Sequence, residues 1–480
     1  MAFSIVKKAV YNGYIPFNYN SRKIGNENIV VAEHGQWAIL DDKELDLLEN
    51  GTIEPRSSLF KLLEEKGIIL TLKNKSLIED YYRQRLNFLF HGTSLHIIVL
   101  TNRCTHKCIY CHASAKGSNC SEFDMSIETA KKTVDFIFQS PSHAITIEFQ
   151  GGEPLLNFDV LKFVVEYAKE KNKREKKDLR ITIVTNLQLM DNEKLDFLLK
   201  NNVSICTSLD GPEEIHNHNR IPEDRSFNSY KNVVKWIKII QKRCREEKKK
   251  WTISALITIT KKSLEKPREI VDEYVNLGLK QLHIRPINFL GFSDENRKKI
   301  GYSAEEFIKF WKDCADYIIE LNKKGIFLRE RTISTIISKI LGKTDPGFLD
   351  MRSPCGACIG QLAYNYDGNI YSCDEARTLK EDVFSIGNVS QKYSEVLGCD
   401  KTCAIISSSI NDASCSECAW KPYCGLCPVD TFAQTNSLIP FLGNDFRCKL
   451  NNFQFEYVFR KIMEKEFQEK IVKKWFSLHS

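Results

Sequence analysis

Cys104-Thr-His-Lys-Cys108-Ile-Tyr110-Cys111 brings three cysteines into eight consecutive positions, with the spacing Cys-x3-Cys-x2-Cys. The stretch follows an apolar run at residues 95–101, which predicts a buried strand. A loop of three thiolates after a strand can hold three irons of a 4Fe-4S cube and leave the fourth iron without a protein ligand. A zinc site that lacks its fourth ligand, or structural thiols, are the alternatives that this spacing leaves open.

The composition is typical of a globular protein with room for two or three domains. Of 480 residues, 42% are hydrophobic and 27% are charged. We expect a cytoplasmic protein without a membrane partner, because the first residues lack the features of a signal peptide and no apolar run reaches membrane-span length. The net charge of +7 is modest for this length, so no nucleic-acid partner is expected. Seventeen cysteines without a secretion signal favour metal or redox chemistry over disulfides.

Strand-like and helix-like patterns alternate after residue 94. Such alternation predicts a parallel sheet with right-handed crossovers, and sites in such folds lie at the C-terminal ends of the strands. The predicted strands are 95–101, 144–149, 181–185, 203–209, 252–260 and 281–287, and the predicted helices are 126–139, 157–171, 191–201, 228–248 and 265–277.

Distinctive polar groups follow four of these strands. They are Cys104 after the first strand, Gly151-Gly152-Glu153-Pro154 after the second, Asn186 after the third, and Ser208 with Asp210-Gly211 at the end of the fourth. Because the carboxyl ends of parallel strands meet at one edge, we expect these groups to share one site.

Ten further cysteines occur between residues 355 and 448. Turn residues separate them, and the segment has little apolar periodicity, so we expect cross-links or metals to hold it together. Two-residue spacings such as that of Cys355 and Cys358 also suit zinc, so a pair of zinc ribbons stays open. Cys399 and Cys403 lie outside any pattern, whereas four other cysteines are expected to be buried apolar residues: Cys120, Cys206, Cys244 and Cys314.

The three-cysteine loop, with Gly-Gly-Glu-Pro about 40 residues later, resembles the radical S-adenosylmethionine (SAM) enzymes. The resemblance implies a partial (β/α)6 TIM-like barrel, in which SAM chelates the open iron and is cleaved to a 5′-deoxyadenosyl radical that abstracts hydrogen from the substrate. It implies cluster ligands at Cys104, Cys108 and Cys111. It also implies SAM contacts at Tyr110, Gly151, Gly152, Glu153, Ser208, Arg220 and Leu282, although Leu282 also suits the barrel core.

The later cysteines resemble the SPASM extension of peptide-modifying radical SAM enzymes, which carries two auxiliary 4Fe-4S clusters. Gly425-Leu426 makes one spacing a residue shorter than is usual there. In sulfatase-maturing relatives an aspartate at the place of Asp374 takes a proton from the substrate, so Asp374 is the predicted catalytic base; capping its own loop is the alternative. The family pattern implies Cys355, Cys358, Cys373 and Cys427 for one cluster, and Cys415, Cys418, Cys424 and Cys448 for the other.

Residues 1–92 predict a separate small α+β unit. A hairpin within 28–40, a helix at 43–49 and a second helix through 66 resemble the winged-helix-like peptide-recognition module of enzymes that modify ribosomally made peptides. In such modules a leader peptide adds a strand to a sheet edge. An extension packed against the barrel is the alternative. The remaining predicted units are the barrel at 93–300, a helical bridge at 301–350, the SPASM domain at 351–450 and a C-terminal helix at 451–480.

The resemblance implies an enzyme, a radical SAM/SPASM oxidoreductase that modifies side chains of a precursor peptide with a leader. The product would be a cross-link such as a thioether, C–C or C–O bond, or an epimer, and residues 355–377 look like those of maturases of the His-Xaa-Ser peptide systems. Three 4Fe-4S clusters, SAM and an electron donor such as flavodoxin or ferredoxin are implied. A sulfatase-maturing, formylglycine-forming enzyme and a non-enzymatic metal-binding regulator are the competing interpretations.

Overall fold

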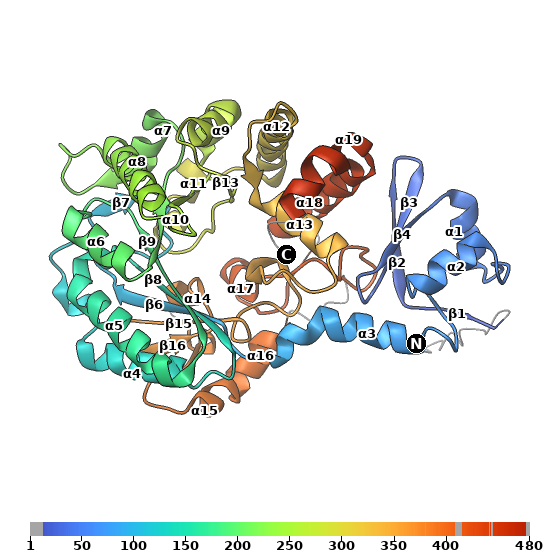
Figure 1. The fold of residues 1–480 in the computed structure, drawn as a ribbon, viewed down its shortest axis with the longest axis horizontal. Helices are drawn as coiled ribbons and strands as arrows, with labels where there is room; N and C mark the ends of the chain where they lie inside the picture. Colours follow the sequence, from blue (N-terminus) through green and yellow to red (C-terminus); the bar gives the residue numbers. More distant parts are fainter. Residues whose placement is uncertain (1–12, 380, 409–414, 441, 443–444, 477–480) are drawn as a thin grey trace.

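The computed structural model describes residues 13–379, 381–408, 415–440, 442 and 445–476. The first twelve residues of the predicted N-terminal unit and the last four of the predicted C-terminal helix lie outside this range. Figure 1 shows the N-terminal unit at one end, the large sheet with its helices at the other, and the later helices between them. No helix in the described part of the chain is long and apolar enough to cross a membrane.

Five parallel strands form the barrel sheet, in the order β12-β10-β9-β8-β6. Residues such as Ile147, Phe149 and Ile183 alternate along these strands and are fully buried in the main core. Helices with one apolar face pack on the outside, as in a partial radical SAM-type barrel, so the predicted α/β fold class is confirmed (Figure 1). The strands are β6 (Leu95–Thr101), β8 (Ala144–Gly151), β9 (Asp178–Thr185), β10 (Ser204–Ser208) and β12 (Ser254–Leu256), and the helices are α4 (Ile127–Ile137), α5 (Phe158–Glu175), α6 (Asn192–Lys200), α7 (Glu213–Asn219), α8 (Ser229–Glu246) and α9 (Pro267–Asn276).

The sixth predicted strand, 281–287, is much shorter in the structure. Only β13 (Gln281–Leu282) forms, and it pairs in parallel with β14 (Arg329–Glu330) instead of joining the barrel sheet. Pro286 cannot donate a ladder hydrogen bond, which opposes a longer strand. The backbone N–H of Ile284 instead donates to the buried carboxylate of Glu330, at 3.4 Å.

The cysteine-rich segment extends the barrel sheet on its other side. β15 (Gln361–Tyr364) pairs in parallel with β6, and β16 (Asn369–Tyr371) and β17 (Ser385–Asn388) follow as antiparallel neighbours. The Tyr364 hydroxyl lies 2.8 Å from Nδ1 of the buried His96, so a side-chain contact also holds β15 against β6. The segment that contains Cys358 and Cys373 is therefore built onto the strand that precedes the three-cysteine loop.

The N-terminal unit has its own sheet and its own core. The predicted hairpin and both helices are present, and Asp41 caps the first helix in a capping box with Glu44. The polar strand at 19–24 was not predicted. The elements are β1 (Ile15–Pro16), β2 (Tyr19–Ile24), β3 (Glu27–Ala32), β4 (Trp37–Leu40), α1 (Asp42–Glu49), α2 (Ser58–Glu65), β5 (Ile69–Leu70) and α3 (Lys75–Leu86).

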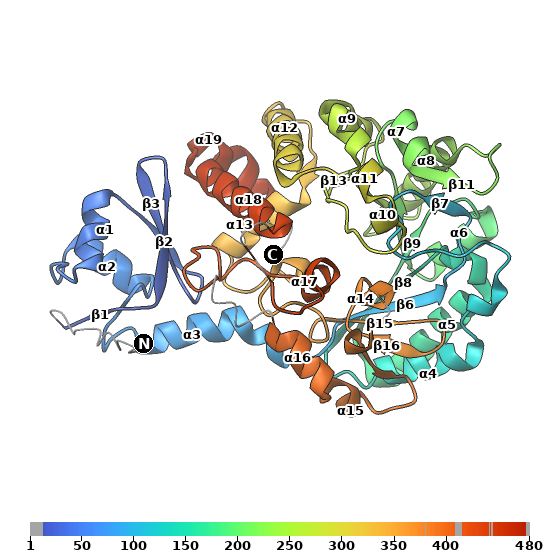
Figure 2. The same cartoon turned by 180° about the vertical axis from the view of Figure 1, so that it is seen from behind.

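This unit docks on the later part of the chain, as the opposite view in Figure 2 shows. Trp37 Nε1 donates to the carbonyl of Ile340, at 3.0 Å. The Tyr423 hydroxyl donates to the carbonyl of Gly35, at 2.8 Å. Asn20 on β2 donates to the carbonyl of Ser416, at 2.9 Å. The unit thus contacts the loop that carries Cys415 and Cys424.

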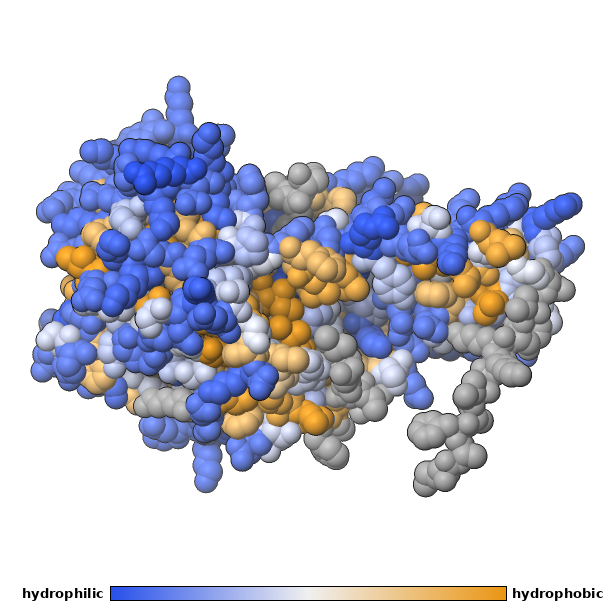
Figure 3. Space-filling view, turned by 90° about the horizontal axis from the view of Figure 1, so that it is seen from below, coloured by the Kyte–Doolittle hydropathy of each residue, from blue (hydrophilic) through white to orange (hydrophobic). Residues whose placement is uncertain are grey.

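The helical bridge consists of α12 (Ala304–Lys323) and α13 (Arg331–Leu341), separated by β14. α18 (Phe446–Met463) begins five residues before the predicted C-terminal helix, so Cys448 lies in its first turn. In the view of Figure 3, hydrophilic side chains cover much of the barrel end, and hydrophobic ones gather toward the middle. The remaining elements are β7 (His106–Cys108), β11 (Arg220–Pro222), α10 (Phe292–Glu295), α11 (Arg297–Ile300), α14 (Ala376–Leu379), α15 (Tyr393–Leu397), α16 (Asp400–Ser408), α17 (Pro428–Thr435), α19 (Lys465–Phe467) and α20 (Lys473–Phe476).

Candidate active site

The three-cysteine loop leaves the end of β6 and opens onto a cavity of about 510 Å³. Cys104, Cys108 and Cys111 all line this cavity. The loop is anchored by Arg103, whose guanidinium pairs with Asp124 and also donates to the carbonyl of Ser118, at 2.8 Å. Three thiols on one anchored loop that face one cavity fit the ligand set of a 4Fe-4S cluster with an open iron.

The backbone before Cys104 passes so close to Gly151 and Gly152 that neither position has room for a side chain. A Cβ on Gly151 would lie 2.2 Å from the carbonyl oxygen of Thr101, and a Cβ on Gly152 would lie 1.9 Å from that of Arg103. Gly151 also has a φ of 137°, which favours glycine. The N–H groups of Gly152 and Glu153 donate to those same two carbonyls, at 2.8 and 2.7 Å. The Gly-Gly pair lines the cavity and holds the backbone that leads into Cys104.

Glu153 is buried and does not line the cavity. Its carboxylate accepts hydrogen bonds from the Thr185 hydroxyl at 2.6 Å and from the backbone N–H of Asn186 at 2.8 Å. Burial raises the pKa of Glu153 to about 7, although these donors act in the opposite direction. Asn186 in turn donates to Nδ1 of His106, at 3.1 Å, and its side chain lies 3.7 Å from Sγ of Cys104. The carboxylate of Glu153 therefore holds Asn186 in place, and Asn186 contacts the loop.

Tyr110, Ser208 and Arg220 line the same cavity, as predicted SAM contacts should. Arg220 is already paired with the buried Asp210 through Nε at 3.2 Å and Nη2 at 3.3 Å, and it stacks over the Tyr110 ring at 5.2 Å. The Tyr110 hydroxyl also donates to Asp210, at 2.6 Å. Arg220 keeps further donors for a ligand, since a guanidinium has five.

Leu282 is fully buried in the main core and does not line the cavity. Its neighbours Gln281 and His283 line the cavity instead, because successive residues of an extended chain face opposite sides. Leu282 therefore packs in the barrel core, which was the alternative to a contact with SAM.

Asp374 lines the cavity and is buried. Arg377 donates to its Oδ1 at 2.8 Å, and Nε2 of His112 donates to its Oδ2 at 3.1 Å. Burial acts to raise the pKa of Asp374, but the Arg377 guanidinium and His112 outweigh burial and hold this pKa below its usual range. Asp374 is thus an ionised carboxylate at the wall of the cavity.

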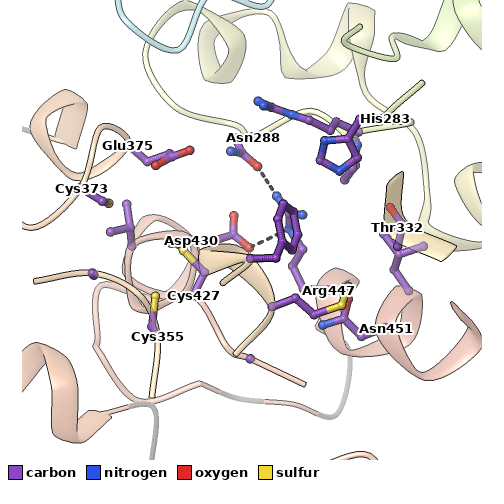
Figure 4. Close-up of a pocket in the computed structure, with 18 of the residues that line it drawn as sticks. His283, Asn288, Thr332, Cys355, Cys373, Glu375, Cys427, Asp430, Arg447 and Asn451 are labelled. Atoms are coloured by element: carbon purple, nitrogen blue, oxygen red, sulfur yellow. Dashed lines mark hydrogen bonds and ion pairs between the residues drawn. The ribbon is translucent and has the colours of Figure 1, made fainter. Parts of the chain in front are cut away.

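A second, smaller cavity adjoins the first, because residues such as His283, Phe348 and Glu375 line both. Cys355, Cys373 and Cys427 face it, as Figure 4 shows. Burial raises the pKa of Cys373 and Cys427 well above the ordinary thiol value, and negative charge on Cys355 raises both pKa values further. Cys358 is also fully buried, and the charge of Cys355 acts on it too. Buried thiols grouped in this way fit thiolate ligands, which metal binding deprotonates.

A separate group of cysteines gathers at the start of α18. Burial raises the pKa of Cys424 to about 12, and negative charge on Cys418, Cys415 or Cys448 raises it further. These effects indicate that the four thiols lie close together. Asn451 donates to Sγ of Cys424 at 3.2 Å. The structure thus brings these eight cysteines into two groups, and their assignment to two clusters stays a prediction of the family pattern. Within the described ranges, no three His, Cys, Asp or Glu side chains are arranged as ligands of a single metal ion.

Several residues of the site were not predicted. His112 and Cys206 line the cavity, and Arg377 holds Asp374. Cys206 was expected to be a buried apolar residue, and this was wrong: it shares the inner side of β10 with Ser208. The period-2 alternation of the strand is the signal that could have revealed it. Cys244 and Cys314 are buried in the core as expected, whereas Cys120 is only partly buried.

Residues 98–266 match the family model described as the radical SAM superfamily. This part of the chain is a radical SAM domain, which supports an enzyme and implies a 4Fe-4S cluster and SAM. The match includes the three cysteines, the Gly-Gly pair and Arg220, and it ends before Leu282.

The similarity to known proteins extends well beyond this domain. The chain is 26% identical to the cysteine-type anaerobic sulfatase-maturating enzyme of Clostridium perfringens, over 77% of this chain and 97% of that protein. It resembles the solved structure of native anSMEcpe with bound AdoMet, with a TM-score of 0.65 and 22% identity over 79% of this chain and 100% of that one. It also resembles the solved structure of SuiB of Streptococcus suis bound to precursor peptide SuiA. The TM-score is 0.52 and the identity is 16%, over 90% of this chain and 98% of that one. The chain is thus similar in sequence to a sulfatase-maturating enzyme and shares its fold with SuiB.

Proposed function

We propose that this enzyme modifies a side chain of a ribosomally made precursor peptide that enters the cavity beside the three-cysteine loop. One observation carries the proposal: Cys104, Cys108 and Cys111 line the same cavity as the Gly151-Gly152 backbone and Asp374. SuiB, which is similar over most of this chain, has been solved with a precursor peptide bound.

When bound to Cys104, Cys108 and Cys111, the cluster with SAM supplies a radical that removes a hydrogen atom from the substrate. The residues of this chain position the reactants. Tyr110, Ser208 and Arg220 would hold SAM from the wall of the cavity, and Arg220 is kept in place by its pair with Asp210. Glu153 and Asn186 hold the loop that carries the cluster.

The two further cysteine groups are assigned to two auxiliary 4Fe-4S clusters. Closing a cross-link removes two hydrogens from the peptide in total, so an electron must leave after the first hydrogen is abstracted. Cys373 is followed directly by Asp374, which faces the reaction cavity, so a cluster held by the group with Cys373 would lie nearer to the substrate and would supply an electron acceptor there. Asp374 is proposed to take the accompanying proton and pass it on at once, because Arg377 and His112 hold its pKa below the usual range and keep it ionised. The first group is Cys355, Cys358, Cys373 and Cys427, and the second is Cys415, Cys418, Cys424 and Cys448.

The N-terminal unit is proposed to bind the leader of the precursor. β2 is an edge of its three-stranded sheet, and Ser21, Arg22 and Lys23 on this strand are exposed. An added peptide strand would pair with such an edge. The contact of Asn20 with Ser416 links this strand to the loop of the second cysteine group.

A second candidate function is formylglycine formation in a sulfatase, which the 26% identity to a sulfatase-maturating enzyme favours. Mass spectrometry of co-expressed substrates separates the two functions. A short peptide encoded beside this gene should lose two hydrogens when a cross-link forms. A sulfatase peptide that contains cysteine should exchange sulfur for oxygen, and lose two hydrogens, if formylglycine forms. Modification of only the sulfatase peptide would overturn the proposed function.

A further inference from the structure

The extended chain that follows β13 turns alternate side chains toward the two cavities. Leu282 and Ile284 are buried in the main core, whereas His283 and Arg285 line both the larger cavity and the smaller one beside it. The N–H of Ile259 donates to the carbonyl of Arg285 at 3.2 Å, so the backbone is held in place here. We call His283 and Arg285 the junction pair, because they line the place where the two cavities join.

The polar atoms of the junction pair lack partners. His283 is 8% exposed, and its Nδ1 is buried without a hydrogen bond in the described part of the chain. Figure 4 shows its ring among the residues that line the smaller cavity. The Arg285 guanidinium likewise forms no hydrogen bond or ion pair within the ranges that the structure describes. An unpaired polar group in a buried place costs free energy, so a ligand is expected to pair with these atoms.

The other arginines of this wall are already engaged. Arg447 donates to the side-chain oxygen of Asn288, and its Nε lies 3.8 Å from the carboxylate of Asp430. The guanidinium carbon of Arg331 lies 4.9 Å from the centre of the Phe348 ring. These two side chains are therefore held by the protein itself, which distinguishes them from Arg285.

The carboxylates that line the larger cavity do not pair with Arg285 either. Oε1 of Glu148 accepts a hydrogen bond from Gln150 at 2.5 Å, and Asp374 is held by the contacts described above. Neither Glu148 nor Glu375 forms an ion pair with Arg285, although all three line the cavity. Arg285 thus has open cavity beside it where a buried arginine ordinarily has a carboxylate.

We propose that Arg285 and His283 bind a carboxylate of the peptide substrate and thereby select the peptides that the enzyme modifies. The inference rests on the proposed function, since it needs a peptide in the larger cavity. A guanidinium stays charged, and its paired donors match the two oxygens of a carboxylate. Burial and the charges of the nearby arginines lower the pKa of His283, so its ring is neutral and adds one uncharged donor. The carboxylate comes from an acidic side chain or from the C-terminus of the peptide.

A double-mutant cycle between the enzyme and its peptide tests this contact. The full-length, reconstituted enzyme is given the peptide that it modifies, and KM and kcat are measured by mass spectrometry. Each acid of the peptide is neutralised in turn, Asp to Asn, Glu to Gln and the C-terminus to an amide. We expect Arg285→Met to raise KM by about 10–100-fold with little change in kcat, because a hydrogen-bonded charge is lost. Neutralising one acid should have the same effect on the wild-type enzyme and no further effect on the variant.

Two further variants make the cycle specific. Arg285→Lys keeps the charge but loses the paired donors, so its KM should lie between those of the wild-type enzyme and Arg285→Met. Arg180→Met is the matched control, because the Arg180 side chain is 74% exposed near the start of β9, and its KM should be unchanged. Iron content, SAM binding and SAM cleavage without peptide should be those of the wild-type enzyme in all variants.

The proposal is overturned if no neutralised acid raises KM, or if its effect and that of Arg285→Met add in full. A raised KM in Glu148→Gln with an unchanged KM in Arg285→Met would place a cationic group of the peptide on Glu148 and overturn it too. Loss of iron or of SAM binding in both Arg285 variants would assign this guanidinium to a cofactor instead. If the wild-type enzyme modifies no peptide while it cleaves SAM, the proposed function fails, and this inference fails with it.

Discussion

Nε2 of His112 donates a hydrogen bond to Oδ2 of Asp374 over 3.1 Å, and this contact joins two cysteine segments that are 262 residues apart. His112 follows Cys111 directly, and Asp374 follows Cys373 directly. The same carboxylate is held on its other oxygen by Arg377. The wall between the three-cysteine loop and the first of the later cysteine groups is thus a single hydrogen-bonded unit.

Replacing Asp374 by Asn tests whether this carboxylate takes a proton from the substrate. The variant keeps the size of the side chain and one acceptor for Arg377, but it removes the negative charge. Iron content and SAM binding should be unchanged, and product formation should slow by ~10²–10⁴-fold. Asp382→Asn, at an exposed carboxylate, is the control and should have the wild-type rate. A wild-type rate in Asp374→Asn would make Asp374 structural, and loss of iron would assign it to holding the Cys373 loop.

Replacing Gly152 by Ala should disrupt the three-cysteine loop. The new Cβ would lie 1.9 Å from the carbonyl oxygen of Arg103, so this backbone must move away from its position before Cys104. We expect loss of about four irons per chain and loss of SAM cleavage. Gly117→Ala serves as the control, because the nearest atom is the mobile end of Asn119 at 3.0 Å. Full iron content in Gly152→Ala would show that the loop tolerates the shift.

Much of the fold could be predicted because its signals are local. The apolar run at 95–101 and the helix predicted at 43–49 depend on neighbouring residues, and the structure has a strand and a helix at these places. The pairing of β15 with β6 could not be predicted, since it joins Gln361 to Leu95 through long-range contacts that no periodicity encodes. The strand at 19–24 was missed because its residues are mostly polar and β3, its neighbour in the sheet, is needed to hold it extended.

The candidate site shows the same division. The order of strands and motifs was enough to predict that Cys104, Gly151, Ser208 and Arg220 share one site, and all four line one cavity. It could not reveal that Arg220 is paired with Asp210, which depends on the fold around the end of β10.

Replacing Asp210 by Asn should destabilise the barrel. Asp210 is fully buried and pairs with Arg220, so the variant leaves a buried guanidinium without its counter-charge. Breaking a buried pair from one side costs about 3–5 kcal/mol of unfolding free energy. Denaturant unfolding of the two proteins measures this difference. Asp42→Asn, at an exposed pair with Lys23, should leave stability unchanged, and an equally small effect at Asp210 would contradict the account.

Binding of the leader at β2 should be visible by hydrogen exchange. If a peptide strand pairs with this edge, backbone amides of residues 19–24 should exchange more slowly when the leader is present. β4 lies at the other edge of the sheet and is the internal control, since α1 packs against it. Protection at β4 without protection at β2, or at neither strand, would show that recognition lies elsewhere.

The central claim is that Cys104, Cys108 and Cys111 hold the cluster that cleaves SAM. The most direct test is to count iron and measure SAM cleavage in anaerobically reconstituted wild-type protein and in the variant with all three cysteines replaced by Ala. The account predicts about twelve irons in the wild-type protein, about eight in the variant, and no SAM cleavage by the variant. An unchanged iron count, or SAM cleavage that survives the replacement, would contradict it.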